Sequence, residues 1–157
     1  MPYCIDTSGL LDGYKRYYPP DVFHGLWENV DDLIAAGELI SPEEVLNDLR
    51  MGDDDVFAWA NARAEMFVPL DEPMQIATAE VLAVYADWIP ADRSRNVADA
   101  FVVALARVRN CPVVSGEHWS NSPNLARVKI PNVCDGLGMR HMTFLEMVRE
   151  LGWAFRR

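Results

Sequence analysis

The sequence predicts an α/β fold built on a short parallel sheet of four or five strands, with helices on both faces. Two observations lead to this prediction. Brief apolar runs that read as buried strands alternate with longer segments of helical periodicity, which is typical of a parallel sheet covered on both sides. The chain has 157 residues, 50% of them hydrophobic, which is enough for one core and too little for two. We therefore expect a single domain over residues 1–157.

The N-terminal region is expected to contain one strand and two helices. Residues 3–6 form a short apolar strand, and the helix that begins at Thr7 cannot pass the Pro19-Pro20 pair. Residues 23–34 place apolar side chains at helical spacing and acids on the other face, which predicts an amphipathic helix.

A second strand and three helices follow. The strand is expected at 39–40, after which Ser41 caps the next helix and Pro42 occupies its first turn, where proline is favoured. A further helical pattern covers 56–63. A longer helix follows position 71 and closes before position 90.

The C-terminal half repeats the alternation of helix and strand. Helical periodicity resumes at Asn96, and residues 112–115 supply a third strand. Residues 116–127 are rich in Ser, Asn, Gly and Pro, and this longest non-periodic segment is the best candidate for a mobile loop. The remaining expected elements are a strand at 128–130, a short helix at 133–137, a fifth strand at 140–142 and a closing helix at 144–151.

The charge balance and the cysteines narrow the class of protein. With 14 basic and 24 acidic residues the net charge is −10, which argues against a broad grip on nucleic acid, although a local basic rim can still hold phosphate. Cys4, Cys111 and Cys134 lack zinc-ligand spacing, and we expect reduced and mostly buried thiols. Neither a signal-peptide layout nor an apolar stretch of roughly 20 residues is present. We expect a cytoplasmic protein with no membrane partner.

Carboxylates stand at five places where a predicted strand meets a helix or loop: Asp6, Glu44, Asp48, Asp99 and Glu117. Ligands of an open parallel sheet bind beyond the carboxyl ends of its strands, so we expect these acids to meet at one edge. Crowded carboxylates repel and raise each other's pKa, and a cluster persists mainly where a cation neutralises it. Oxygen-only ligands suit Mg²⁺ or Mn²⁺, and hence phosphate chemistry.

Some of these acids also have structural explanations. Glu44 stands three residues after Ser41, and Asp99 three residues after Asn96, so each could complete a capping box. Acids in the first turn of a helix also gain from the helix dipole without any function. Asp6 is harder to explain structurally, because a charge that closes a buried strand is costly unless it is paired or bound to a cation.

Other residues remain open between structural and functional roles. Glu117 lies in a loop, where an exposed acid needs no function, and its neighbour His118 is the one histidine placed to reach the site. Five tryptophans exceed what one small core readily absorbs, and the exposed ones are candidate contacts of a homodimer. They are Trp27, Trp59, Trp88, Trp119 and Trp153.

The segments around these acids together resemble the PIN-domain ribonucleases, the fold of VapC-type toxins from toxin–antitoxin pairs. Residues 3–12 are similar to the opening strand of that family, where the first acid precedes Thr or Ser and two aliphatic residues. Residues 48–52 are similar to its Glu-Leu-x-x-Gly step, 98–106 to its third-acid helix, and 113–117 to the strand that ends in Thr-x-Asp.

A narrower resemblance is to a less-studied PIN-like branch of small proteins, through residues 25–27, 41–45 and 129–134. In that branch Glu44 is the better match to the second acid. Asp in place of Glu at position 48, and Glu in place of Asp at 117, change the reach to a metal by one methylene.

The resemblance implies an Mg²⁺-dependent endoribonuclease that hydrolyses RNA phosphodiester bonds, the toxin of a pair with a cognate antitoxin as its partner. Asp6, Asp99 and either Glu44 or Asp48 would hold one or two Mg²⁺ ions. Glu117 would complete a second metal site or orient the attacking water. Candidate phosphate contacts are Arg93, Arg95, Arg127 and Lys129.

Two alternatives stay beside this expectation. The domain could be a non-catalytic PIN-like interaction module whose acidic pocket is vestigial. A phosphatase with an aspartyl nucleophile also begins with an acid after its first strand, but such enzymes usually place a second acid two residues later, where this chain has Ser8.

Overall fold

The computed structural model describes residues 1–156 and contains a five-stranded sheet in which all neighbouring strands are parallel. The predicted α/β class is confirmed. The strand order is β3-β2-β1-β4-β5, with the first strand at the centre of the sheet. The strands are β1 (Tyr3–Ile5), β2 (Leu39–Pro42), β3 (Phe67–Val68), β4 (Val113–Val114) and β5 (His141–Met142).

The order of the strands reverses between β1 and β4. From β1 the chain builds outward through β2 and β3, and it then returns to place β4 on the other side of β1. Ile5 pairs with Val114, so the residues that follow the two strands leave the sheet at the same level. A crevice for ligands is expected at such a switch point, beyond the carboxyl ends of the strands.

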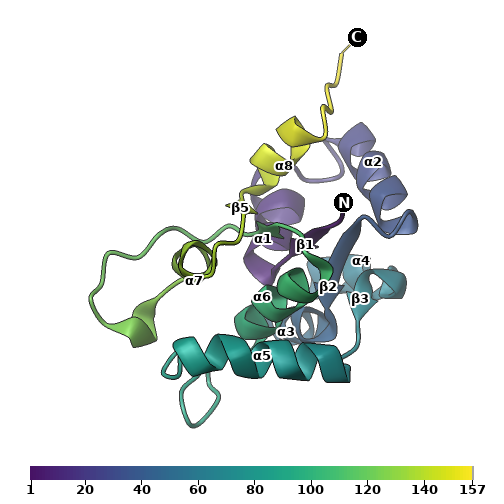
Figure 1. Cartoon of the computed structure of the whole chain (residues 1–157). Coiled ribbons are helices and arrows are strands. Elements are labelled where there is room, and N and C mark those ends of the chain that lie inside the picture. The colour runs from purple at the N-terminus through teal and green to yellow at the C-terminus, as the bar shows by residue number, and fades with distance from the viewer. Residues whose placement is uncertain (157) are drawn as a thin grey trace.

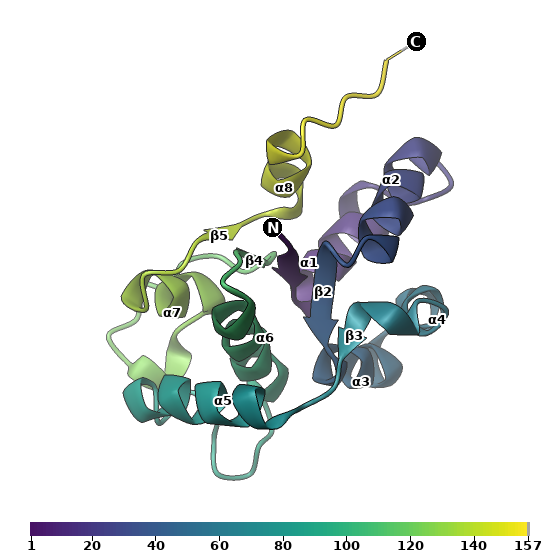
Figure 2. The same cartoon turned by 45° about the vertical axis from the view of Figure 1, so that its right-hand side comes forward.

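Helices cover both sides of this sheet. In Figures 1 and 2, α1, α2 and α8 lie on one side, and α6 lies on the other with α5 packed against its outer surface. A π-helix over Asp12–Tyr17 continues α1, and 3₁₀ turns occupy Ala64–Met66 and Leu125–Arg127. The α-helices are α1 (Thr7–Leu11), α2 (His24–Ala35), α3 (Glu43–Gly52), α4 (Asp54–Asn61), α5 (Glu72–Val84), α6 (Val97–Arg109), α7 (Ile130–Gly136) and α8 (Phe144–Glu150).

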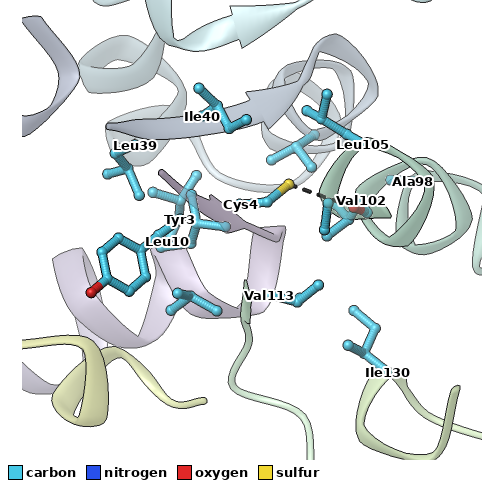
Figure 3. Packing of buried hydrophobic residues seen from close by; sticks show 14 of the residues in the cluster. Tyr3, Cys4, Leu10, Leu39, Ile40, Ala98, Val102, Leu105, Val113 and Ile130 are labelled. Carbon is cyan, nitrogen blue, oxygen red and sulfur yellow. Dashed lines mark hydrogen bonds between the residues drawn. The ribbon is translucent and has the colours of Figure 1, made fainter. Parts of the chain in front are cut away.

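The core is centred on β1 and α6. Cys4 on β1 points toward α6, where its Sγ lies 3.5 Å from the carbonyl oxygen of Val102 (Figure 3). All residues of α6 from Ala100 to Ala106 are buried, which fixes the first turn of this helix relative to the sheet. The three cysteines are buried free thiols, as predicted, and burial raises the pKa of Cys111 to about 11. Within residues 1–156 no helix is long and apolar enough to cross a bilayer.

The core absorbs more tryptophan than the sequence led us to expect. Trp27, Trp59 and Trp88 are buried, and Trp153 packs against the core. Trp27 and Trp59 pack edge to face with ring centroids 5.2 Å apart. Only Trp119 among the five is solvent-exposed, so the expectation of a general surplus of surface tryptophan is wrong.

The expected strand at 128–130 is also wrong. Residues 125–127 form a 3₁₀ turn, and α7 begins at Ile130. Asn132 Oδ1 accepts from the backbone N–H of Lys129 over 3.0 Å at the start of the helix, and Pro131 stands in the first turn, where its missing N–H costs nothing. These helix-start signals outweigh the short apolar pattern. In contrast, the strand β3 was not predicted, because its two residues give too short a pattern.

The expected capping role of Ser41 is wrong as well. Ser41 belongs to β2, and its buried hydroxyl donates to the carbonyl oxygen of Ile5 over 2.6 Å. The N-cap of α3 is Pro42, which has no side chain that can cap. The hydroxyl therefore ties β2 to β1 instead of starting the helix.

Candidate metal centre

Three of the five predicted acids converge at the switch point of the sheet. Asp6 directly follows β1, Asp99 lies in the first turn of α6, and Glu117 follows β4. Each offers a carboxylate oxygen, and these oxygens lie within 4.8 Å of one another. Among the described residues, this is the only group of three or more Asp, Glu, His or Cys side chains that close together. Opposite ligands of an octahedral Mg²⁺ are roughly 4 Å apart, so the spacing suits one ion.

Asp6 is held by hydrogen bonds from three groups. Its side chain is 1% exposed and caps α1 by accepting from the backbone N–H of Gly9 over 2.6 Å. The hydroxyl of Ser8 donates to the carboxylate over 2.8 Å, and that of Ser115 over 3.2 Å. These bonds fix the orientation of the carboxylate before any ligand arrives.

Gly9 is required for this close approach of α1 to the sheet. A Cβ atom on Gly9 would lie 2.8 Å from the carbonyl oxygen of Val114 and 2.9 Å from a side-chain carbon of Ile5. Both distances are shorter than atoms tolerate. The absence of a side chain at position 9 therefore lets the first turn of α1 sit against the ends of β1 and β4.

Serine hydroxyls also order the turn that carries Glu117. Ser8 Oγ accepts from the backbone N–H of Gly116 over 2.9 Å, and Ser115 Oγ accepts from that of Glu117 over 3.0 Å. The Glu117 carboxylate accepts from the N–H of Ile130, the first residue of α7, over 3.3 Å. Glu117 is thus half-buried between two anchored segments, although it lies in a segment without regular structure.

The capping-box explanation does not hold for Asp99 or Glu44. The Asn96 side chain makes no cap for α6; its Nδ2 instead donates to the carbonyl oxygen of Trp88 over 2.7 Å. Ser41 bonds elsewhere, so the reciprocal cap for Glu44 is missing too. Asp99 therefore has no capping role, and the helix dipole is the remaining structural explanation for this half-buried acid in the first turn of α6.

Two of the three acids have strongly raised pKa values. Burial raises the pKa of Asp6 to about 7, despite the lowering effect of its hydrogen bonds and with a small contribution from Glu117. Burial, followed by repulsion from Glu117 and Asp6, raises the pKa of Asp99 to about 8. Among the described residues, no Lys, Arg or His forms an ion pair with any of the three. The oxygen donors could therefore hold a hard divalent metal ion, which would supply the missing positive charge.

Glu44 and Asp48 lie on α3, outside the group of three. One carboxylate oxygen of half-buried Glu44 is buried with no hydrogen-bond partner in the described chain, and burial raises the pKa of this residue. Asp48 is solvent-exposed and accepts from the Thr7 hydroxyl over 3.3 Å, and its charge contributes to the raised pKa of Asp99. Of the two acids on α3, Asp48 is the one whose charge helps to raise the pKa of Asp99.

A basic pocket lies beside the centre. Its volume is about 400 Å³, and it is lined by Arg95, Asn96, Ser120, Ser122, Ala126, Arg127, Val128 and Lys129. Three of the four predicted phosphate contacts share this pocket. The fourth, Arg93, is exposed in the preceding loop and does not line it. A second hollow, of about 180 Å³, includes Ser115, Glu117, His118 and Trp119 in its wall.

Sequence reasoning left three elements of the site without a role. Ser115 was part of a motif, but its bond to Asp6 was not anticipated, although the pairing of the strands would have placed the two side by side. Gly9 gives no signal in the sequence, because its importance depends on a contact with β4. Trp119 was grouped with the other tryptophans as a candidate dimer contact.

Comparison with known proteins adds a family but no activity. No curated protein matches this sequence. A family model described as "Domain of unknown function (DUF4411)" matches residues 3–155, which include the whole sheet and all three acids of the centre. The chain therefore belongs to the DUF4411 family.

Proposed function

We propose that this protein is a divalent-metal-dependent hydrolase of phosphodiester bonds, acting as an endoribonuclease. The observation that carries the proposal is the convergence of Asp6, Asp99 and Glu117, without a paired cation, where the strand order reverses. The all-parallel α/β sheet is compatible with the PIN-like resemblance of the sequence. The finer assignment, to the toxin of a toxin–antitoxin pair with a protein antitoxin, rests on that resemblance alone.

The residues divide into those that would hold the ion and those that position them. Asp6, Asp99 and Glu117 would bind Mg²⁺ or Mn²⁺ directly, and Asp48 would approach from the α3 side. When bound, such an ion lowers the pKa of water and neutralises the charge of a phosphodiester. Ser8 and Ser115 orient Asp6 through their hydroxyls. Both acids with strongly raised pKa values would release their protons as the ion binds.

The basic pocket supports a polyanionic substrate despite the net charge of −10. Two short connections join it to the centre. Asn96 precedes α6, three residues before Asp99, and Lys129 precedes Ile130, whose N–H donates to Glu117. Arg95, Arg127 and Lys129 form no ion pair with any described acid, which leaves them available for phosphate oxygens.

Cleavage of RNA tests the proposal. The purified protein is incubated with a mixed-sequence RNA in Mg²⁺ or Mn²⁺ and, separately, in EDTA. We expect cleavage with either metal, none in EDTA, and a loss of at least 100-fold for Asp99→Asn, since that change removes one ligand of the ion. Asp32→Asn, at an exposed acid on α2, is the matched control and should retain full activity.

The same assay separates the proposal from the interaction-module alternative. If wild type and Asp99→Asn cleave RNA equally, the activity belongs to a contaminant or to other residues, and the assignment fails. If neither the wild type nor the Asp32→Asn control cleaves RNA with any divalent metal, the acidic centre is not that of a ribonuclease.

A further inference from the structure

The hollow beside Glu117 differs in chemistry from the basic pocket. It has a volume of about 180 Å³, less than the roughly 300–1,000 Å³ typical of pockets for whole small molecules. Pro131 and Met142 are apolar and buried, while His118, Trp119, His141, Thr143 and Glu146 complete the rest of the wall. Ser115 and Glu117 line it as well, so the hollow adjoins the candidate metal centre.

Trp119 is the exception among the tryptophans of this chain. Its side chain is 53% exposed, whereas the other four are buried or pack against the core. Trp119 also lines the hollow, so its exposed indole stands at the edge of that hollow. Its large flat face is free to stack on another planar group.

The backbone around Trp119 is anchored. Ser120 N–H donates to Asn132 Oδ1 over 3.0 Å, and Asn132 Nδ2 donates back to the carbonyl oxygen of Ser120 over 2.9 Å. This two-way amide pair ties the segment to α7, beside which it runs in Figure 1. Together with the bond from Glu117 N–H to Ser115, it holds Trp119 between two fixed points. The backbone that carries the indole is therefore held in place beside the centre.

The same segment separates the two hollows. Glu117, His118 and Trp119 line the small one, and Ser120 and Ser122 line the basic pocket. A ligand that crosses this segment would meet cationic side chains on one side. On the other side it would meet an aromatic face, imidazole groups and the carboxylates of Glu117 and Glu146. Single-stranded nucleic acid has this composition, because phosphates alternate with planar bases that have polar edges.

We propose that the hollow beside Glu117 binds one unpaired nucleobase, with Trp119 as its stacking partner, and so restricts the substrate to single-stranded RNA. The inference rests on the proposed function, because it places the base next to the phosphodiester that the metal centre would cleave. His118 borders the hollow and can bond the base edge, whereas the Nε2 atom of His141 is already paired with Asp135 over 3.0 Å. A base inside a duplex is stacked on both faces and cannot enter.

Binding measurements in a cleavage-deficient background test this inference. Fluorescence anisotropy is measured with labelled RNA of about ten nucleotides, with the corresponding duplex, and with an abasic strand that has the same phosphates. All proteins carry Asp99→Asn so that the RNA stays intact. The added variants are Trp119→Ala, Trp119→Phe and, as the matched control, Phe155→Ala, whose side chain is 52% exposed in the C-terminal tail.

We expect Trp119→Ala to weaken binding of the single strand by roughly 5- to 150-fold, the effect of losing one aromatic stacking contact. Trp119→Phe should retain most of the affinity, Phe155→Ala should retain all of it, and binding of the abasic strand and of the duplex should not change in any variant. Circular dichroism that matches the parent confirms that each variant is folded.

Three outcomes would overturn the inference. Trp119→Ala could bind the single strand as the parent does, it could lose affinity equally for the abasic strand or the duplex, or the parent could fail to bind single-stranded RNA. Failure of the proposed function gives a different result, namely no metal-dependent cleavage by the wild type. A protein that cleaves RNA but is insensitive to Trp119 therefore contradicts only the base-binding site.

Discussion

The hydroxyl of Ser115 lies 3.2 Å from the carboxylate of Asp6, across 109 positions of the sequence. The bond joins the residues that follow β4 and β1, the two strands between which the sheet order reverses. Because β1 and β4 are neighbours in the sheet, the serine that follows β4 can orient the acid that follows β1. The same segment after β4 also carries Glu117. The alignment of these two strand ends therefore brings Asp6 and Glu117 together at the centre.

Without a divalent cation, the stability of the folded protein should fall as the pH rises. The pKa values of Asp6 and Asp99 are about 7 and about 8 when folded, against about 4 for an unfolded Asp, so the folded state binds more protons between these values. The stabilisation that comes from these extra bound protons is complete below about pH 4. It decreases as the pH rises above that value and is lost once the pH has passed through 7 and 8. Urea unfolding in EDTA between pH 5 and pH 8.5 measures it. A free energy of unfolding that rises over this range would contradict the raised pKa values.

Asp99→Asn should stabilise the metal-free protein while it removes metal binding. At pH 8 the wild type must either keep a proton on Asp99 or bury a charge, and the amide avoids both. We expect the free energy of unfolding in EDTA to increase by about 2–4 kcal/mol, as at other sites where function opposes stability. The gain should shrink at pH 5, where Asp99 of the wild type is neutral. Asp32→Asn should leave the unfolding curve unchanged at both pH values.

Gly9→Ala should damage both stability and the centre. The new methyl group would lie 2.8 Å from the carbonyl oxygen of Val114, a backbone atom that cannot move aside alone. We expect a loss of about 1–3 kcal/mol in the free energy of unfolding, which is typical of overpacking, and weaker metal binding. Gly52→Ala is the matched control, because no atom lies within 4 Å of its added methyl group and its φ is not positive. Equal unfolding midpoints for the two variants would refute the close-packing argument.

Replacement of a basic side chain in the basic pocket should lower the affinity for RNA and also make that affinity less dependent on salt concentration. Arg127→Ala and Lys129→Ala each delete one candidate phosphate contact. The slope of log affinity against log salt should become shallower by about 0.7 per contact for a single strand. Arg149→Ala, at an exposed position on α8, should keep the slope of the wild type. If all three variants behave alike, the pocket does not contact the phosphates.

Much of the fold could be predicted from the sequence, because its elements carry strong local signals. Apolar runs mark β1 and β4, and the long helix α6 has a pronounced apolar pattern. The prediction is wrong where the local sequence signal is too short, or where a helix signal and a strand signal fall on the same residues. Two residues are too few to reveal β3, and the helix-start signals of Pro131 and Asn132 outweigh the apolar pattern at 128–130.

The acids of the site could be proposed from the sequence because a carboxylate after a buried strand is costly without a partner. Sequence spacing could not decide between Glu44 and Asp48, since both lie on α3 one turn apart. In the structure their surroundings differ, because Thr7 donates to Asp48, whereas one buried oxygen of Glu44 has no hydrogen-bond partner in the described chain. Trp119 could not be recognised in advance, because its exposure depends on how many tryptophans the core can hold.

The central claim is that Asp6, Asp99 and Glu117 form one divalent-metal centre, and titration of Mn²⁺ into the metal-free protein by calorimetry tests it most directly. The wild type and Asp32→Asn should show saturable binding that strengthens between pH 6 and pH 8, as protons leave the raised-pKa acids, whereas Asp99→Asn and Glu117→Gln should lose most of it. No saturable heat from the wild type, or the same binding curve from all four proteins, would contradict the account.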